Sequence, residues 1–212
     1  MTISIVTGLP GFGKTLKLAE FGVKAMDAGK PVYANFRMHN LRRPELYTHF
    51  NDPLEVLGKV SNALILMSEV GILLDQMRMY QIDPLVWDEL RQHRKDGVNI
   101  IADAQSMGDV SYMFRRLIQF QYHIYSKMKV FPSTRLTPHG LTLQLVRVFN
   151  PQPKGADYGR RYWKHDTSYF QFYDTNYKLE KTESLYDQAQ RVIEAPYAEG
   201  LYDRYGKILR DI

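Results

Sequence analysis

The chain contains a glycine-rich segment whose residue types and spacing can bind phosphate. The segment matches the pattern G-x-x-x-x-G-K-T and consists of Gly8, Leu9, Pro10, Gly11, Phe12, Gly13, Lys14 and Thr15. Glycines let such a loop curl so that successive backbone N–H groups point at phosphate oxygens. Lys14 can then reach the β- and γ-phosphates, and the Thr15 hydroxyl can bind Mg²⁺. The segment predicts a nucleoside triphosphate site, with ATP and Mg²⁺ as cofactors; the alternative is a glycine-rich turn without a ligand.

Hydrolysis of a bound triphosphate requires an acidic group that orients the attacking water or holds Mg²⁺. We expect this group at the carboxyl end of the strand beside the phosphate-loop strand. The apolar run 63–67 fits that strand and is followed by Ser68 and Glu69. Glu69 is therefore the expected catalytic carboxylate, unless it only caps the following helix. Ser68 stands where the common motif has an aspartate, and its hydroxyl can at most bind a metal-bound water.

Two later residues complete the predicted catalytic set. Gln105 ends the apolar run 98–105, where a polar side chain would lie near the γ-phosphate or bond to the next loop. Arg115 is followed by Arg116, and either guanidinium can stabilise the charge on a phosphoryl group held by a neighbouring subunit. That role requires an oligomer, and without one the two residues are a surface charge pair.

An acidic pair at Asp88 and Glu89 is a weaker catalytic candidate. The residues around it form a charged helical segment behind Pro84, which is typical of a solvated helix face.

Two basic clusters can contact nucleic acid, or can be solvated loops whose aromatic residues cover the core. The clusters are Arg37, His39, Arg42 and Arg43, and Lys154, Arg160, Arg161, Lys164 and His165 interleaved with Tyr158, Tyr162 and Trp163. The net charge of +5 over 212 residues is too mild to decide between nucleic-acid binding and a solvated surface.

The elements that position these residues alternate as in an α/β protein. Strands are expected over 3–7, 32–36, 63–67, 98–105 and 122–130, and helices from Lys14 and near 71–81, 84–95 and 109–119. Residues 37–62 predict a loop and a short helix. After residue 131 the alternation over 141–149 predicts a β-hairpin extension packed on the core, followed by an aromatic-rich stretch over 158–177 and helices near 183–194 and 200–210.

Length and composition favour a single core rather than two equal domains. We expect one α/β domain over residues 1–180 and a helical appendage over 181–212. The chain contains no cysteine, which excludes disulfides, zinc ribbons and thiol chemistry. The N-terminus is expected to be a core strand rather than a signal peptide, and no apolar stretch approaches the roughly 20 residues that cross a bilayer. A soluble protein in a compartment that supplies ATP is therefore expected.

Several segments together resemble the zonula occludens toxin-like ATPase domain. They are 5–11, 31–35, 94–101 with Gln105, 114–117 and 173–176. The likeness spans about residues 1–180, and its specificity lies in the order and spacing of the later segments. That family includes the assembly and export ATPases of filamentous phages. It belongs to the wider FtsK/HerA group, which also contains the genome-packaging ATPases of tailless icosahedral viruses.

The resemblance implies a RecA-like P-loop NTPase fold, with a mostly parallel sheet flanked by helices and a C-terminal β-hairpin and helical extension. It also implies ring oligomers and DNA translocation powered by ATP. By the same resemblance, Lys14 and Thr15 bind phosphate and Mg²⁺, Glu69 activates water, Gln105 senses the γ-phosphate and Arg115 is the trans-acting arginine. Two departures are Ser68 in place of the acid, and the missing membrane span and further domain of the filamentous-phage proteins.

On this basis we expect a viral assembly ATPase that packages viral DNA into a capsid as a homo-oligomeric ring. Its partners would be the DNA and the capsid or packaging vertex, in the host cytoplasm or associated with the virion. The runner-up is the cytosolic ATPase domain of a filamentous-phage extrusion protein, which acts in an export complex at the inner membrane. Two different classes of protein also contain phosphate loops: a small-molecule kinase, for which no lid is evident, and a nucleotide-dependent scaffold that does not hydrolyse.

Overall fold

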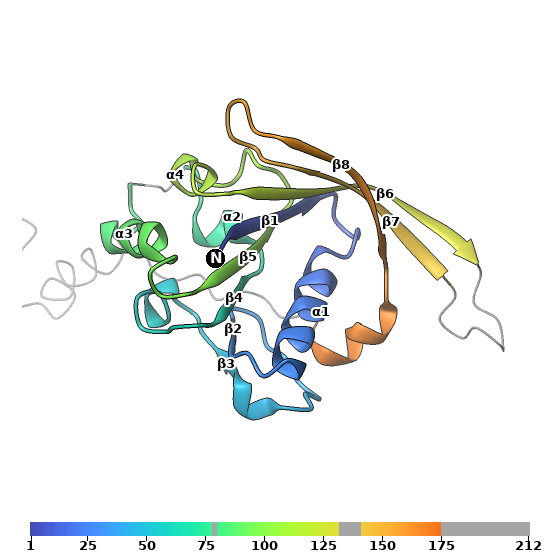
Figure 1. Ribbon diagram of the computed structural model, residues 1–212, viewed down its shortest axis with the longest axis horizontal. Helices are drawn as coiled ribbons and strands as arrows, with labels where there is room; N and C mark the ends of the chain where they lie inside the picture. Colours follow the sequence, from blue (N-terminus) through green and yellow to red (C-terminus); the bar gives the residue numbers. More distant parts are fainter. Residues whose placement is uncertain (78–79, 132–140, 175–212) are drawn as a thin grey trace, which may run out of the picture.

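The apolar run before the phosphate-binding segment forms β1 (Ile3–Gly8), which is buried on both faces. The computed structural model describes residues 1–77, 80–131 and 141–174. Within them, β1 leads through a tight loop into α1 (Lys14–Asp27), as Figure 1 shows. The helix ends next to Gly29, whose φ of 82° is a conformation that favours glycine. The predicted appendage over 181–212 and its two helices lie outside the described residues.

An eight-stranded sheet forms the middle of the described structure, with the order β3-β2-β4-β5-β1-β6-β7-β8. The strands after β1 are β2 (Val32–Ala34), β3 (Tyr47–His49), β4 (Leu64–Met67), β5 (Asn99–Ala104), β6 (Phe120–Phe131), β7 (Leu141–Phe149) and β8 (Asp157–Lys164). All pairings from β3 to β6 are parallel, whereas β6, β7 and β8 pair antiparallel. This mostly parallel sheet flanked by helices confirms the predicted fold class. The antiparallel strands continue the same sheet.

Helices cover both faces of the sheet (Figure 1). One face holds α1 and the 3₁₀ helix η3 (Thr167–Phe172), and the other holds α2 (Val70–Leu73), α3 (Pro84–Gln92) and α4 (Tyr112–Arg115). Each face has its own apolar cluster: Leu18 of α1 belongs to the first, and Leu90 and Phe114 belong to the second. Because both faces are covered, β4 consists entirely of buried apolar residues.

Two predicted helices are much shorter in the structure, because local bonds fix the end of one and the start of the other. The helix expected over 71–81 is wrong in length, since α2 ends at Leu73 and Asp75 forms an antiparallel bridge with Val110. The helix expected over 109–119 is limited to α4, which begins after Ser111; the Ser111 hydroxyl accepts the backbone N–H of Met113. The segment 37–62 contains the 3₁₀ helices η1 (Pro44–Leu46) and η2 (Pro53–Glu55), with β3 between them. A three-residue strand is too short to leave a periodic signal.

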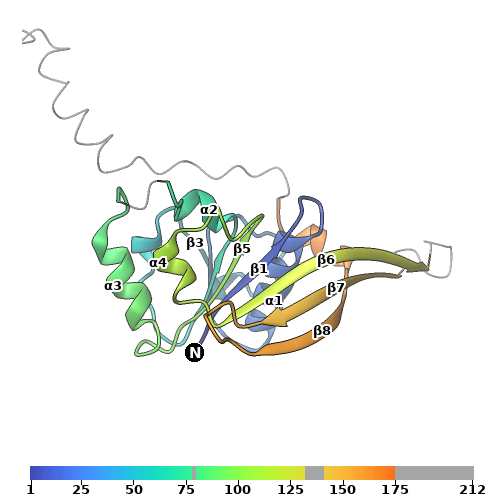
Figure 2. The ribbon, with the colours of Figure 1, turned by 90° about the horizontal axis from the view of Figure 1, so that it is seen from above.

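The strands β6 and β7 extend beyond β1 as a two-stranded arm. β6 pairs with β1 only up to Ile124, whereas its pairing with β7 continues to Phe131. Figures 1 and 2 both show this arm projecting from one end of the molecule. Met128, Val130 and Phe131 are exposed on it. The fold therefore positions the phosphate-binding loop where the parallel sheet meets the antiparallel strands.

Candidate nucleotide site

Two glycines of the loop, Gly8 and Gly13, occupy positions where a side chain would clash with its surroundings. Gly13 has φ 79° and precedes α1, and a Cβ atom there would lie 2.5 Å from Cε1 of His165. At Gly8 a Cβ atom would lie 2.6 Å from the carbonyl oxygen of Ile124. Lys14 Nζ folds back over the loop and donates to the carbonyls of Gly8 (2.9 Å) and Leu9 (3.2 Å). Burial lowers the pKa of Lys14, and the carboxylates of Asp103 and Glu69 act in the opposite direction.

A comparison of two glycines tests this packing. We expect Gly13→Ala to lower the free energy of unfolding by about 3 kcal/mol, because left-handed backbone strain adds to the clash with His165. Gly11→Ala is the matched control, because Gly11 has a similar φ of 77° but no atom within 4 Å of its Cβ position. Its free energy of unfolding should fall only by the cost of the left-handed backbone strain, about 1 kcal/mol. Urea unfolding without nucleotide measures both values, and equal losses would show that His165 does not press on the loop.

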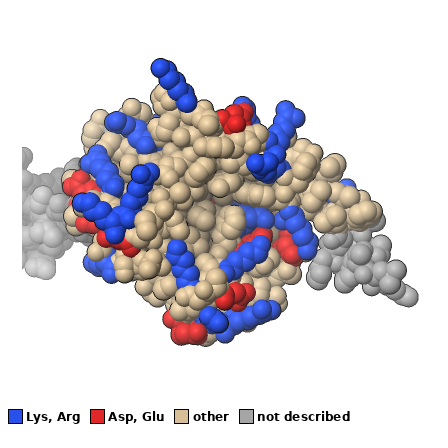
Figure 3. Space-filling view, viewed as in Figure 1, with Lys and Arg blue, Asp and Glu red and all other residues tan. Residues whose placement is uncertain are grey.

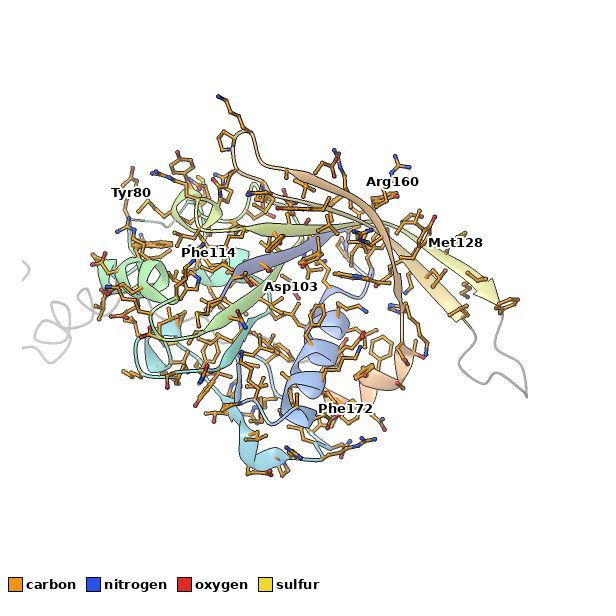
Figure 4. All side chains as sticks on the ribbon, in the orientation of Figure 1. Tyr80, Asp103, Phe114, Met128, Arg160 and Phe172 are labelled. Carbon is orange, nitrogen blue, oxygen red and sulfur yellow. The ribbon has the colours of Figure 1, made fainter. Side chains whose placement is uncertain are left out.

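A buried carboxylate that sequence analysis did not select lies at the centre of the site. Asp103 belongs to β5 and has no exposed surface. Its Oδ2 accepts hydrogen bonds from Thr15 Oγ1 (3.0 Å) and Ser68 Oγ (3.3 Å), and its Oδ1 accepts the backbone N–H of Glu69 (2.7 Å). Figure 4 shows Asp103 in the interior of the molecule, between the sheet and α1. The available signal was the single charged residue inside the apolar run 98–105.

The strand order corrects the expected position of the acidic motif. β5, rather than β4, lies beside β1, and β4 pairs with β2 and β5. The prediction that Glu69 follows the strand next to the phosphate-loop strand is therefore wrong. Both strands are short buried apolar runs, so their sequences do not show which one lies beside β1. Glu69 still reaches the site, because parallel strands end at the same edge of the sheet.

The backbone at Glu69 is held in an unusual conformation. Glu69 has φ 49° and ψ 50° and precedes α2, but its side chain makes no capping hydrogen bond. Asn35 fixes the turn from the next strand: its Nδ2 donates to the Ser68 carbonyl (2.9 Å), and its Oδ1 accepts the Ser68 N–H (2.6 Å). A left-handed non-glycine residue costs roughly 1–3 kcal/mol and is typical of functional sites. The geometry leaves the Glu69 carboxylate free of a capping role.

A cavity of about 320 Å³ brings most of the predicted site together. Its lining includes Lys14, Thr15, Glu69, Gln105 and Asp103. The remaining lining residues come from the loop, from the antiparallel strands and from the segment around η3: Pro10, Gly11, Gly13, Lys127, His165, Phe170 and Tyr173. Gly8, Leu9 and Phe12 complete the loop without lining the cavity. The arrangement can hold a polyphosphate beside a carboxylate and an amide.

Arg115 lies elsewhere and does not line this cavity. It ends α4 on the sheet face opposite α1, and its Nη2 donates to Gln76 Oε1 (3.1 Å). Its Nε is buried and has no hydrogen-bond partner within the described part of the chain. Arg115 and Arg116 both lie against the Tyr112 ring, at 5.9 and 5.7 Å from its centroid. The side chain therefore does not reach the nucleotide site of its own subunit.

His165 closes the site from the antiparallel strands instead of belonging to a solvated basic surface. Gln144 donates to the Phe12 carbonyl and lies 3.2 Å from His165 Nδ1, which ties β7 to the phosphate loop. Burial, with smaller effects of Lys127 and Lys17, lowers the pKa of His165 to about 4. The imidazole is thus neutral at pH 7.

In the space-filling view, basic residues are spread over the surface among acidic ones (Figure 3), so no single basic patch stands out on this face.

The burial of Asp103 predicts a pH-dependent stability. Burial raises the pKa of Asp103 to about 6, against the opposing effects of the Glu69 N–H, Thr15 and Lys14. Below pH 4 the carboxyl is protonated in both the folded and the unfolded state. Between pH 4 and 6 the unfolded chain releases this proton first, so the free energy of unfolding should fall with rising pH, by roughly 3 kcal/mol.

Asp103→Asn should remove this contribution and make the protein without nucleotide more stable above pH 6. Urea unfolding at pH 4.5 and pH 7.5 measures it. Asp88→Asn is the control, because Asp88 is an exposed residue of α3 that pairs only with Arg91 in the described structure. Parallel pH curves for the wild type and Asp103→Asn would contradict the assignment.

Comparisons with known proteins support the fold. The sequence matches no protein-family model and no curated protein. Among solved structures, the N-terminal domain of zonular occludens toxin from Neisseria meningitidis matches with a TM-score of 0.53 at 16% identity, covering 82% of this chain and 98% of that domain. The genome packaging NTPase B204 from Sulfolobus turreted icosahedral virus 2, in complex with AMP, matches with a TM-score of 0.44 at 12% identity, covering 59% and 75%. The chain has a P-loop NTPase fold similar to that of the toxin domain, as its sequence predicts.

Proposed function

We propose that this chain is an ATPase that couples hydrolysis to the movement of viral DNA, in genome packaging into a capsid. The observation that supports hydrolysis best is the cavity in which the phosphate loop faces both Glu69 and Gln105. A phosphate loop alone would suit any nucleotide-binding protein, whereas a carboxylate facing it can orient water. The sequence resemblance to the zonula occludens toxin-like ATPases supports DNA as the cargo.

The predicted catalytic residues of the cavity each have a role in this proposal. The loop N–H groups and Lys14 bind the phosphates, Glu69 accepts the proton of the attacking water and Gln105 contacts the γ-phosphate. The side-chain atoms around the Thr15 hydroxyl that could bind a metal ion are oxygen atoms, which Mg²⁺ prefers as ligands. Mg²⁺ commonly binds through few protein oxygens together with the substrate phosphates. This fits the described residues, among which no group of three or more His, Asp or Glu can hold a metal ion. When bound, Mg²⁺ would neutralise charge on the β- and γ-phosphates.

The proposed assembly state rests on a trans role for Arg115. Because this side chain does not line the cavity of its own subunit, we place it at the nucleotide of a neighbour in a homo-oligomeric ring. Residues 1–180 would form the ATPase domain and 181–212 a helical appendage. The partner would be the capsid or packaging vertex, in the host cytoplasm or virion. Within the described residues, no helix is long and apolar enough to cross a membrane.

The test is steady-state ATP hydrolysis with single- and double-stranded DNA titrated across a range of protein concentrations. A translocase should hydrolyse faster with DNA, and its rate per subunit should rise steeply with protein concentration. A kinase or a scaffold should respond to neither. Stimulation by single-stranded DNA alone would favour the filamentous-phage extrusion ATPase, whose export complex lies at the inner membrane, over packaging. Turnover that ignores both DNA types at every concentration would refute the motor.

A further inference from the structure

One acidic side chain of the expected motif is missing from β4, and a carboxylate is present on the neighbouring strand. The last paired residues of β4 and β5 are Met67 and Ala102, so Ser68 and Asp103 follow as neighbours across the two strands. We propose that Asp103 is the acid that holds Mg²⁺ beside Thr15, in place of the carboxylate that Ser68 lacks. This inference rests on the proposed function, because it assigns a role within the same nucleotide site.

The hydrogen bonds show that the two side chains share one location. Thr15 Oγ1 lies 3.0 Å from Asp103 Oδ2 and 3.3 Å from Ser68 Oγ, and Ser68 Oγ lies 3.3 Å from the same Asp103 oxygen. An acid at either position would thus contact Thr15 in the first turn of α1. The negative charge therefore lies on β5 instead of at the end of β4, and it remains beside the phosphate loop.

The environment of Asp103 favours a ligand role over a purely structural one. The carboxylate is fully buried, and its three bonds come from two hydroxyls and one backbone N–H rather than from a cation. Lys14 Nζ, the ammonium of the loop, is bonded to the carbonyls of Gly8 and Leu9 instead. A buried carboxylate without a bonded cation costs stability. A site that receives a divalent cation with its nucleotide explains why the acid is present.

The experiment measures the affinity for AMPPNP by calorimetry, with Mg²⁺ and with EDTA. The ratio of the two affinities, the Mg²⁺ gain, is the readout, and it does not depend on turnover. We expect Asp103→Asn to reduce the gain by about tenfold or more while changing the affinity in EDTA by less than about threefold. Ser68→Ala should reduce the gain far less, and Asp88→Asn should behave as the wild type. Circular dichroism melts confirm that each variant is folded.

A swap of the two residues tests the exchange directly. Asp103→Ser alone should lose the gain, and Ser68→Asp combined with Asp103→Ser should regain most of it. An Asp103→Asn protein that keeps the full gain, or that loses affinity equally with Mg²⁺ and EDTA, would overturn the inference and leave the ATPase proposal standing. A swap that recovers nothing would contradict the exchange between strands. A wild type that binds no AMPPNP in either condition would overturn the proposed function as well.

Discussion

Replacing Glu69 with glutamine should lower kcat for ATP hydrolysis by about 10²–10⁴-fold and leave nucleotide affinity nearly unchanged. Glu69 lines the cavity, has a left-handed backbone and makes no capping bond. Glutamine keeps the size of the side chain but cannot accept the proton of the attacking water. Phosphate release under saturating ATP, together with calorimetric AMPPNP binding, separates the two effects.

Asp88→Asn is the control for this substitution, since Asp88 is an acid after an apolar run but lies on the exposed face of α3. It should hydrolyse ATP at the wild-type rate. Wild-type hydrolysis by the Glu69→Gln protein would refute the catalytic assignment. Loss of nucleotide binding in that protein would instead assign Glu69 to the structure of the site.

Removing the Arg115 guanidinium should abolish only the turnover that depends on assembly, with a loss of about 10³-fold or more. The buried Nε has no hydrogen-bond partner in the described structure, and the side chain lies outside its own cavity, so Arg115→Ala should bind AMPPNP normally. Arg116→Ala is the matched control, because Arg116 lies against the same Tyr112 ring and is more exposed. The rate per subunit as a function of protein concentration measures the effect.

Mixing two inactive proteins distinguishes a trans-acting arginine from a local one. Lys14→Ala should lack a working nucleotide site but still supply Arg115, whereas Arg115→Ala should supply the nucleotide site without the arginine. Mixed rings should regain activity at the interfaces that combine the two intact parts. Two outcomes would contradict the trans role: an Arg115→Ala protein that is as active as the wild type at every concentration, or two inactive proteins that recover no activity on mixing. Loss in Arg116→Ala alone would move that role to Arg116.

The phosphate loop and its flanking elements are predictable because their information is local. The glycine spacing, the apolar run of β1 and the helical spacing of α1 lie within about 25 consecutive residues. The buried runs of β4 and β5 are equally clear, because both faces of the sheet are covered. Gln105 and Glu69 enter the cavity as expected, since each follows a parallel strand at the same edge.

The features that the sequence does not reveal depend on which strands become neighbours. Asp103 looks like an irregularity in an apolar run until β5 is placed between β1 and β4. His165 lies 152 positions after Gly13, and only the turn from β6 through β8 brings its ring to that glycine. The early end of α2 and the late start of α4 have the same origin, because the bridge between Asp75 and Val110 takes the place of helix at both positions. The periodicity of apolar residues depends on neighbours along the chain and therefore does not reveal contacts between distant segments.

Phosphate release from ATP in the presence of Mg²⁺ and DNA, by the wild type beside Lys14→Ala, tests the central claim most directly. We predict sustained Mg²⁺-dependent turnover by the wild type and none above background by Lys14→Ala, which lacks the ammonium that we propose binds the phosphates. Equal rates for the two proteins, or no turnover by a wild type that binds AMPPNP, would contradict an ATPase at this site.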